Sequence, residues 1–183
     1  MKRLFMVLAA GAGLMLSSTA VFAQGRPGAV FTTAWDGAQV NANHFEYGSD
    51  VYLDGGPGPN APAHAAALPA GDYVFQVTDP SGKALLSTDP PECRTFHVDE
   101  AGLISGVGDA GGCEHATGYD PGRGAVTVQL YHFEDSPNAG GVYKVWVTPV
   151  DEFDPAGGGY YGFAPSESKT DNFKVVYSGG IPD

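Results

Sequence analysis

The alternation of side chains along the chain constrains its fold more than any other feature. In one segment Tyr73, Phe75 and Val77 fall on one side of an extended chain, whereas Gln76 and Thr78 fall on the other. A period of two residues is the period of a β-strand. Beyond the first 23 residues, no segment repeats the 3.6-residue helical period for more than one turn. The pattern therefore predicts an all-β protein.

Turn signals separate the extended segments from one another. The segments expected to be extended are residues 30–34, 39–41, 50–53, 72–79, 84–87, 94–98, 102–105, 125–133, 142–150 and 172–177. Three connections between them are predicted to be hairpins, at residues 36–37, 99–100 and 136–141. We expect about seven to nine strands in a single antiparallel β-sandwich, of the prealbumin-like or immunoglobulin-like kind.

The N-terminus has the three parts of a secretory signal peptide. Lys2 and Arg3 precede an apolar run over residues 4–16, and Val21 and Ala23 stand where signal peptidase reads small residues. Glycines and serines interrupt the run before it reaches the roughly 20 apolar residues that span a bilayer. We therefore expect residues 1–23 to be cleaved and residues 24–183 to form one domain. The mature protein is predicted to be secreted or periplasmic, with no further membrane insertion.

The charge of the chain limits its partners. The sequence holds 9 Lys and Arg against 21 Asp and Glu, a formal net charge of −12. Such a surface repels nucleic acid and anionic lipid, so no nucleic-acid partner is expected. It attracts cations, calcium included, and basic partners. The simpler interpretation is that acidity keeps an exported protein soluble.

The only two cysteines, Cys93 and Cys113, are predicted to form a disulfide in an oxidising compartment. The alternative is a thiol pair for redox or metal chemistry, which the lack of Cys-x-x-Cys spacing disfavours. Near these cysteines, His97, Glu114 and His115 form the one cluster that suggests a transition-metal site. Ordinary surface histidines are the simpler interpretation.

An acidic loop offers a calcium site. Asp151, Glu152 and Asp154 supply three carboxylates within four residues, next to a glycine-rich segment. Hard cations favour such oxygens on flexible loops. Asp50 and Asp54 flank a strand that was expected to lie near this loop. The spacing of an EF-hand is lacking, so a solvated acidic loop is the alternative. No cofactor is required by any motif.

Aromatic residues in or beside loops suggest a binding surface. These residues are Trp35, Tyr160, Tyr161 and Phe163. Exposed rings on loops are typical of surfaces that bind a glycan or a peptide. The alternative is that the rings pack into the core or against their own loop.

One run of 15 residues, 68–82, reads L-P-A-G-D-Y-V-F-Q-V-T-D-P-S-G. It resembles the L-P-x-G-x-Y-x-x-x-V-T-D-x-x-G hairpin of bacterial surface modules with prealbumin-like or Cna-B-like sandwich folds. Residues 51–57, 137–149 and 169–174 extend the resemblance to a group of secreted bacterial proteins without an established activity. The resemblance implies a strand that starts at a glycine–tyrosine corner and packs into the core. The lysine of a Cna-B-like isopeptide crosslink is missing, because Lys83 is the first lysine after the signal peptide, so Asn172 is not assigned that role.

No motif of a hydrolase is present in the sequence: there is no nucleophile elbow and no zinc-binding helix. No catalytic residue is assigned. We therefore expect a secreted, non-catalytic module for cell-envelope or matrix association, or for recognition of a glycan or protein. A secreted glycosidase-like hydrolase is the alternative, since the separation of two carboxylates is not visible in a sequence.

Overall fold

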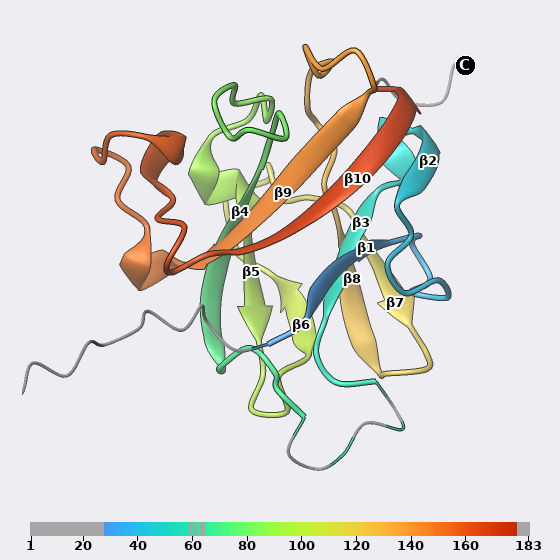
Figure 1. The fold of residues 1–183 in the computed structure, drawn as a ribbon. Helices are drawn as coiled ribbons and strands as arrows, with labels where there is room; N and C mark the ends of the chain where they lie inside the picture. Colours follow the sequence, from blue (N-terminus) through green and yellow to red (C-terminus); the bar gives the residue numbers. More distant parts are fainter. Residues whose placement is uncertain (1–27, 59, 61, 63–64, 179–183) are drawn as a thin grey trace, which may run out of the picture.

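The computed structural model describes residues 28–58, 60, 62 and 65–178, and these form an all-β structure (Figure 1). The predicted signal peptide lies outside the described residues. The described residues contain no α-helix. No helical segment among them is long and apolar enough to cross a membrane. The strands are β1 (Val30–Thr33), β2 (His44–Tyr47), β3 (Tyr52–Gly55), β4 (Gly71–Thr78), β5 (Thr95–Val98), β6 (Ile104–Val107), β7 (Thr117–Asp120), β8 (Ala125–Gln129), β9 (Val142–Pro149) and β10 (Lys169–Tyr177). Four 3₁₀ turns accompany them: η1 (Gly48–Asp50), η2 (Pro91–Arg94), η3 (Val150–Glu152) and η4 (Tyr160–Gly162).

The described strands form two sheets. One has four strands in the order β1-β3-β8-β7, and the other has six in the order β2-β10-β9-β4-β5-β6. Every neighbouring pair is antiparallel except β2 and β10, which run parallel with His44 opposite Lys174. The expectation of a purely antiparallel arrangement is therefore wrong at this pair, and the described strands number ten instead of seven to nine.

One apolar core is shared by the two sheets. Leu53 and Val128 from the four-stranded sheet and Phe75 and Val147 from the six-stranded sheet all belong to it and are at most 1% exposed. The predicted inward face of β4 is confirmed, because Tyr73, Phe75 and Val77 all lie in this core. Burial of this apolar area is the main stabilising contribution to the fold.

The outer face of β4 is also buried. Val74 packs with Trp146 of β9 and Phe163 in a second, small cluster. The long connection between β9 and β10, which projects at the left of Figure 1, supplies Phe163. The residues of β4 from Tyr73 onward are consequently buried on both faces, whereas the alternation of the sequence predicted one covered face.

The glycine–tyrosine corner at the start of β4 forms as the resemblance implied. The Tyr73 hydroxyl donates a hydrogen bond to the Pro69 carbonyl over 2.8 Å, and its ring stacks on Phe96 with 5.6 Å between centroids. A tyrosine that bonds back to the backbone just upstream is a recurrent corner of Greek-key β-proteins.

Several predicted elements are correct, but two predicted hairpins and one predicted strand are not. The hairpin of β5 and β6 is confirmed, with a register shift at its end. The turn at residues 36–37 forms, but β1 pairs with β3, so no strand returns at residues 39–41. Residues 84–87 make only isolated bridges, to Thr78 and Phe133. Residues 136–141 connect β8 and β9, which lie in different sheets and cannot form a hairpin. Strands β2 and β7 were not predicted.

Strand β10 bonds to both β1 and β2. Strand β2 pairs with β10, and Asp171 of β10 accepts two hydrogen bonds from Thr32 of β1, one from its N–H over 2.8 Å and one from its hydroxyl over 3.0 Å. Because β1 belongs to the four-stranded sheet, these contacts also join the two sheets.

Candidate functional site

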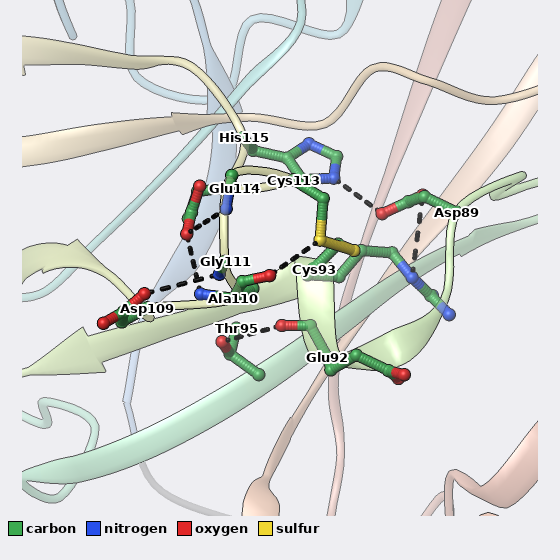
Figure 2. The surroundings of a disulfide bond; sticks show 12 residues. Asp89, Glu92, Cys93, Thr95, Asp109, Ala110, Gly111, Cys113, Glu114 and His115 are labelled. Atoms are coloured by element: carbon green, nitrogen blue, oxygen red, sulfur yellow. Dashed lines mark hydrogen bonds and ion pairs between the residues drawn. A yellow bond between two sulfur atoms is a disulfide. The ribbon is translucent and has the colours of Figure 1, made fainter.

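The predicted disulfide is present between Cys93 and Cys113, whose Cα atoms are 5.3 Å apart (Figure 2). Cys93 belongs to η2, directly before β5, and Cys113 lies in the connection from β6 to β7. Strand β6 belongs to the six-stranded sheet and β7 to the four-stranded sheet. The bond therefore fastens the point where the chain crosses from one sheet to the other.

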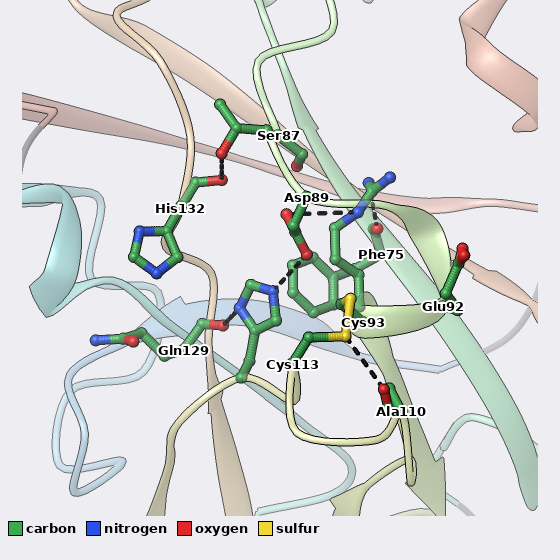
Figure 3. Close-up of polar contacts among 12 residues, drawn as sticks. Phe75, Ser87, Asp89, Glu92, Cys93, Ala110, Cys113, Gln129 and His132 are labelled. Carbon is green, nitrogen blue, oxygen red and sulfur yellow. Dashed lines mark hydrogen bonds and ion pairs between the residues drawn. A yellow bond between two sulfur atoms is a disulfide. The ribbon is translucent and has the colours of Figure 1, made fainter.

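A buried polar cluster lies beside the disulfide (Figures 2 and 3). His115 Nε2 is 2.9 Å from Asp89 Oδ2, and His115 Nδ1 is 2.7 Å from the Gln129 carbonyl oxygen. Arg94 Nε lies 3.8 Å from the other oxygen of Asp89, and a terminal nitrogen of Arg94 donates to the Phe75 carbonyl over 2.9 Å. Each ring nitrogen of His115 therefore lies within hydrogen-bond distance of an oxygen atom.

This cluster has the composition of a catalytic site but the geometry of a structural one. A histidine that acts as a general base needs a free nitrogen directed at a nucleophile or a water. In His115 both nitrogens are occupied, and the side chain is 3% exposed. The cluster instead satisfies buried charge next to the disulfide.

The transition-metal cluster suggested by the sequence does not form. His97 pairs with Asp72 across β5 and β4, and Glu114 accepts N–H bonds from Gly112 and Ala110 that lower the pKa of its carboxyl. His115 is taken up by the buried cluster. Within the described part of the chain, no group of three or more His, Cys, Asp or Glu side chains is placed to hold a metal ion.

The carboxylates of the acidic loop, predicted as a calcium site, also do not gather around one point. Asp151 and Glu152 lie in η3 with exposed side chains, whereas Asp154 Oδ1 accepts the Ala156 N–H over 3.0 Å. Asp54, expected near this loop, is completely buried against Arg123 instead. The calcium site therefore stays a prediction from the sequence.

Two of the four predicted binding residues come together in a defined hollow. Tyr160 and Tyr161, 39% and 43% exposed, line a hollow of about 570 Å³ with Gly82, Lys83, Gly157 and Gly159. Both tyrosines have a left-handed backbone, with φ of 38° and 55°. The Gln76 amide donates to the Tyr160 carbonyl over 2.9 Å, and the Tyr161 hydroxyl donates to the Lys83 carbonyl over 2.5 Å.

The floor beneath these tyrosines is closely packed. The Tyr160 ring lies against Trp146 with 5.0 Å between centroids, and the Trp146 indole N–H donates to the Thr78 hydroxyl over 2.9 Å. Gly82 makes this contact close, because a Cβ there would lie 2.6 Å from Tyr160 Cδ1. Phe163 is 3% exposed and supports the loop from within.

Trp35 lies in another part of the structure. It follows β1, it is 62% exposed, and its carbonyl accepts hydrogen bonds from β7 and β8. Trp35 lines a separate hollow with residues of β2, η1 and β3. The structure therefore splits the predicted aromatic set into one exposed pair, one exposed single residue and one core residue.

A buried charge cluster was not recognised from the sequence. Arg123 bonds to Asp120 over 2.6 Å, lies 3.6 Å from Asp54 and covers the Phe31 ring at 4.9 Å. Burial raises the pKa of Asp54 to about 7, and the Gly55 N–H and the charge of Arg123 offset only part of this. Although burial opposes it, hydrogen bonds from Arg123 and Gly122 lower the pKa of Asp120.

Comparison with protein-family models, with curated proteins and with solved structures gave no match.

Proposed function

We propose that the mature chain is a secreted or periplasmic, non-catalytic β-sandwich module that recognises an extracellular glycan through Tyr160 and Tyr161. The shared core of the two sheets and the Tyr73 corner support a sandwich of the prealbumin-like kind. The observation that carries the function is the pair of exposed rings, which a strained but well-supported backbone holds at the edge of a hollow.

The strain is informative because glycine would have avoided it. A non-glycine residue in the left-handed region costs on the order of 1–3 kcal/mol, and it persists only where the surroundings hold it. Here two consecutive tyrosines adopt this conformation, and Gln76 and Lys83 hold them by hydrogen bonds. The result is two phenol rings at the surface with fixed backbone positions, as a recognition surface requires.

The chemistry of the hollow suits a carbohydrate. A tyrosine ring offers an apolar face and a polar edge, and a pyranose offers an apolar C–H face and a rim of hydroxyls. The Trp146 ring, which lies against Tyr160, also has the Lys144 ammonium 5.4 Å from its centroid. Stacking on the rings and hydrogen bonds from the edge of the hollow would together hold a neutral or acidic sugar.

The hydrolase alternative receives less support. A glycosidase needs two accessible carboxyl groups, one with a raised pKa. Among the described carboxyl groups, Asp54 is the one whose pKa is raised, and its side chain is 0% exposed, so no substrate reaches it. In the Asp89–His115 pair, both ring nitrogens of His115 are already engaged, one by Asp89 and one by the Gln129 carbonyl.

Binding to polysaccharides tests the proposal. The mature protein is incubated with insoluble cellulose, chitin, xylan and peptidoglycan, and soluble fragments of whichever retains it are then titrated by calorimetry. We expect Tyr161→Ala to weaken the affinity by about tenfold or more and Tyr161→Phe to keep most of it, because the ring carries the contact.

Tyr177→Ala is the matched control, since Tyr177 is an exposed ring on β10, in another element. Thermal unfolding of each variant verifies that it is folded. Equal retention of wild type and Tyr161→Ala on every polysaccharide, or no retention of the wild type, would contradict the proposal.

A further inference from the structure

A second aromatic hollow, the Trp35 hollow, has a different chemical character. It measures about 490 Å³, and its lining includes Trp35, Phe45, Asp50, Tyr52 and Gln129. Three of these side chains are aromatic rings and one is a carboxylate. The Tyr160–Tyr161 hollow shares none of these residues and contains a lysine instead.

The exposed Trp35 is held in place through its backbone. Its carbonyl accepts the Tyr119 N–H over 3.0 Å and the Thr127 hydroxyl over 2.7 Å. Gly118 of β7 permits this approach, because a Cβ on that residue would collide with the Trp35 carbonyl oxygen. The structure therefore fixes the position of a large apolar residue whose side chain is 62% exposed, although solvent exposure of such a ring is unfavourable.

The space between the rings is open. Among the described residues, no ring-to-ring contact joins Trp35, Phe45 and Tyr52. Phe45 instead packs edge-on against Phe173 of the core, with 6.4 Å between ring centroids. Phe45 and Tyr52 are half-buried, so one side of each is held by the protein while the hollow faces the other. A small group can enter without displacing a packed side chain.

The charge in this hollow is negative and uncompensated. Asp50 forms no ion pair with any described residue, since the described ion pairs involve Asp54, Asp72, Asp89 and Asp120. Asp50 and Tyr52 line the same hollow, and burial first, and then the Asp50 carboxylate, raises the pKa of the Tyr52 phenol. Gln129 already donates its amide N–H to the Ser49 carbonyl over 2.7 Å.

We propose that the Trp35 hollow binds a small organic cation, a quaternary or methylated ammonium group, with the rings of Trp35 and Tyr52 around it and the Asp50 carboxylate beside it. Aromatic faces attract such a cation through their quadrupole, most strongly for tryptophan. A chain with a net charge of −12 draws cations toward this surface. The proposal does not depend on glycan binding at Tyr160 and Tyr161, because the two hollows share no residue.

The two tryptophans allow a direct test by nuclear magnetic resonance. Each gives one indole N–H signal, and Trp35→Phe assigns them. Choline is titrated into the ¹⁵N-labelled mature protein, and the buried Trp146 indole, bonded to Thr78, serves as an internal reference that also reports folding. The same titration is repeated with 3,3-dimethylbutan-1-ol, which has the shape of choline without its charge, and with methyl glucoside.

We expect choline to shift the Trp35 signal in a saturable manner while the Trp146 signal stays in place. The uncharged analogue should bind about five- to tenfold more weakly, and Asp50→Asn should weaken choline by a similar factor. Equal binding of the uncharged analogue would overturn the proposal and leave a merely apolar hollow. A shift of the Trp35 signal with methyl glucoside alone would overturn it in favour of a sugar site at this hollow, and an unmoved Trp35 signal with all three compounds would also refute it.

Discussion

Replacing Asp54 by asparagine should stabilise the protein at neutral pH. Asp54 is fully buried, its Oδ1 accepts the Gly55 N–H over 2.7 Å, and its Oδ2 has no hydrogen-bond partner among the described residues. Arg123 already forms a close ion pair with Asp120. A proton on Asp54 therefore leaves the cluster neutral, whereas its loss leaves one buried negative charge in excess. Asparagine has the shape of the protonated acid without that titration.

The magnitude follows from the pKa of Asp54, which burial raises from 3.8 to about 7. Below about pH 4 the acid is protonated in both the folded and the unfolded chain, and it has no effect on the pH dependence. Between pH 4 and 7 only the unfolded chain ionises, so the free energy of unfolding falls by about 1.4 kcal/mol per pH unit. Above pH 7 the full loss applies, up to about 4 kcal/mol.

Urea unfolding followed by tryptophan fluorescence at pH 4.5, 6.0 and 7.5 measures this effect. The difference between Asp54→Asn and wild type isolates Asp54 from every other carboxyl group. We expect this difference to grow in favour of the variant as the pH rises through this range. Asp120→Asn is the contrasting control, because it removes the ionised partner of Arg123 and should destabilise the protein at pH 7.5.

A difference that stays constant from pH 4.5 to 7.5 would refute the reasoning, since it would mean that Asp54 ionises equally in the folded and unfolded chains. A variant that is less stable than wild type at pH 7.5 would refute it more directly. That result would show that the Asp54 carboxylate is favourably paired with Arg123 at neutral pH.

Three further outcomes follow from the described contacts. Asp89→Ala should lower the free energy of unfolding by about 3 kcal/mol in urea, because it leaves Arg94 and His115 buried without their acid; an unchanged value would show that the pair contributes nothing. Replacing Cys93 and Cys113 by serine should also cost about 3 kcal/mol, and a wild type whose thermal unfolding is insensitive to reductant would contradict this. Millimolar calcium tests the acidic loop predicted from the sequence: a rise of several degrees in the melting temperature would support the site, and an unchanged melting temperature would contradict it.

The local part of the fold was predictable because its information is local. Strand β4 alternates apolar side chains that meet the core, and the single pair of cysteines left one disulfide to form. The pairing of β2 was not predictable, since this strand of four residues has only half-buried apolar positions and its partner β10 lies some 130 residues along the chain. The turn at residues 36–37 forms as its sequence indicates, but the strand that pairs with β1 follows later.

In the candidate sites, too, local features were predictable from the sequence and long-range contacts were not. A loop position was visible in the sequence for Tyr160 and Tyr161, but their left-handed backbone is held by hydrogen bonds with Gln76 and Lys83, which come from elsewhere in the chain. Phe163 is buried because the outer face of β4 needs cover, and the strand itself gives no sign of that need. For Asp54 the decisive factor is its complete burial beside Arg123, and no spacing in the sequence marks that contact.

The dependence of β1 and β2 on β10 sets the order in which the molecule is completed. Strand β2 receives its pairing, and Thr32 of β1 its carboxylate partner, from the final described strand. Contacts so distant in sequence form late and make folding slow. A chain that emerges with its N-terminus first therefore has an incomplete six-stranded sheet until β10 has also emerged. Loss of β10 would leave the edge of β9 unpaired and remove the partner of β2. A C-terminal truncation that removes β10 from Lys169 onward is therefore expected to be far less tolerated than shortening of a surface loop.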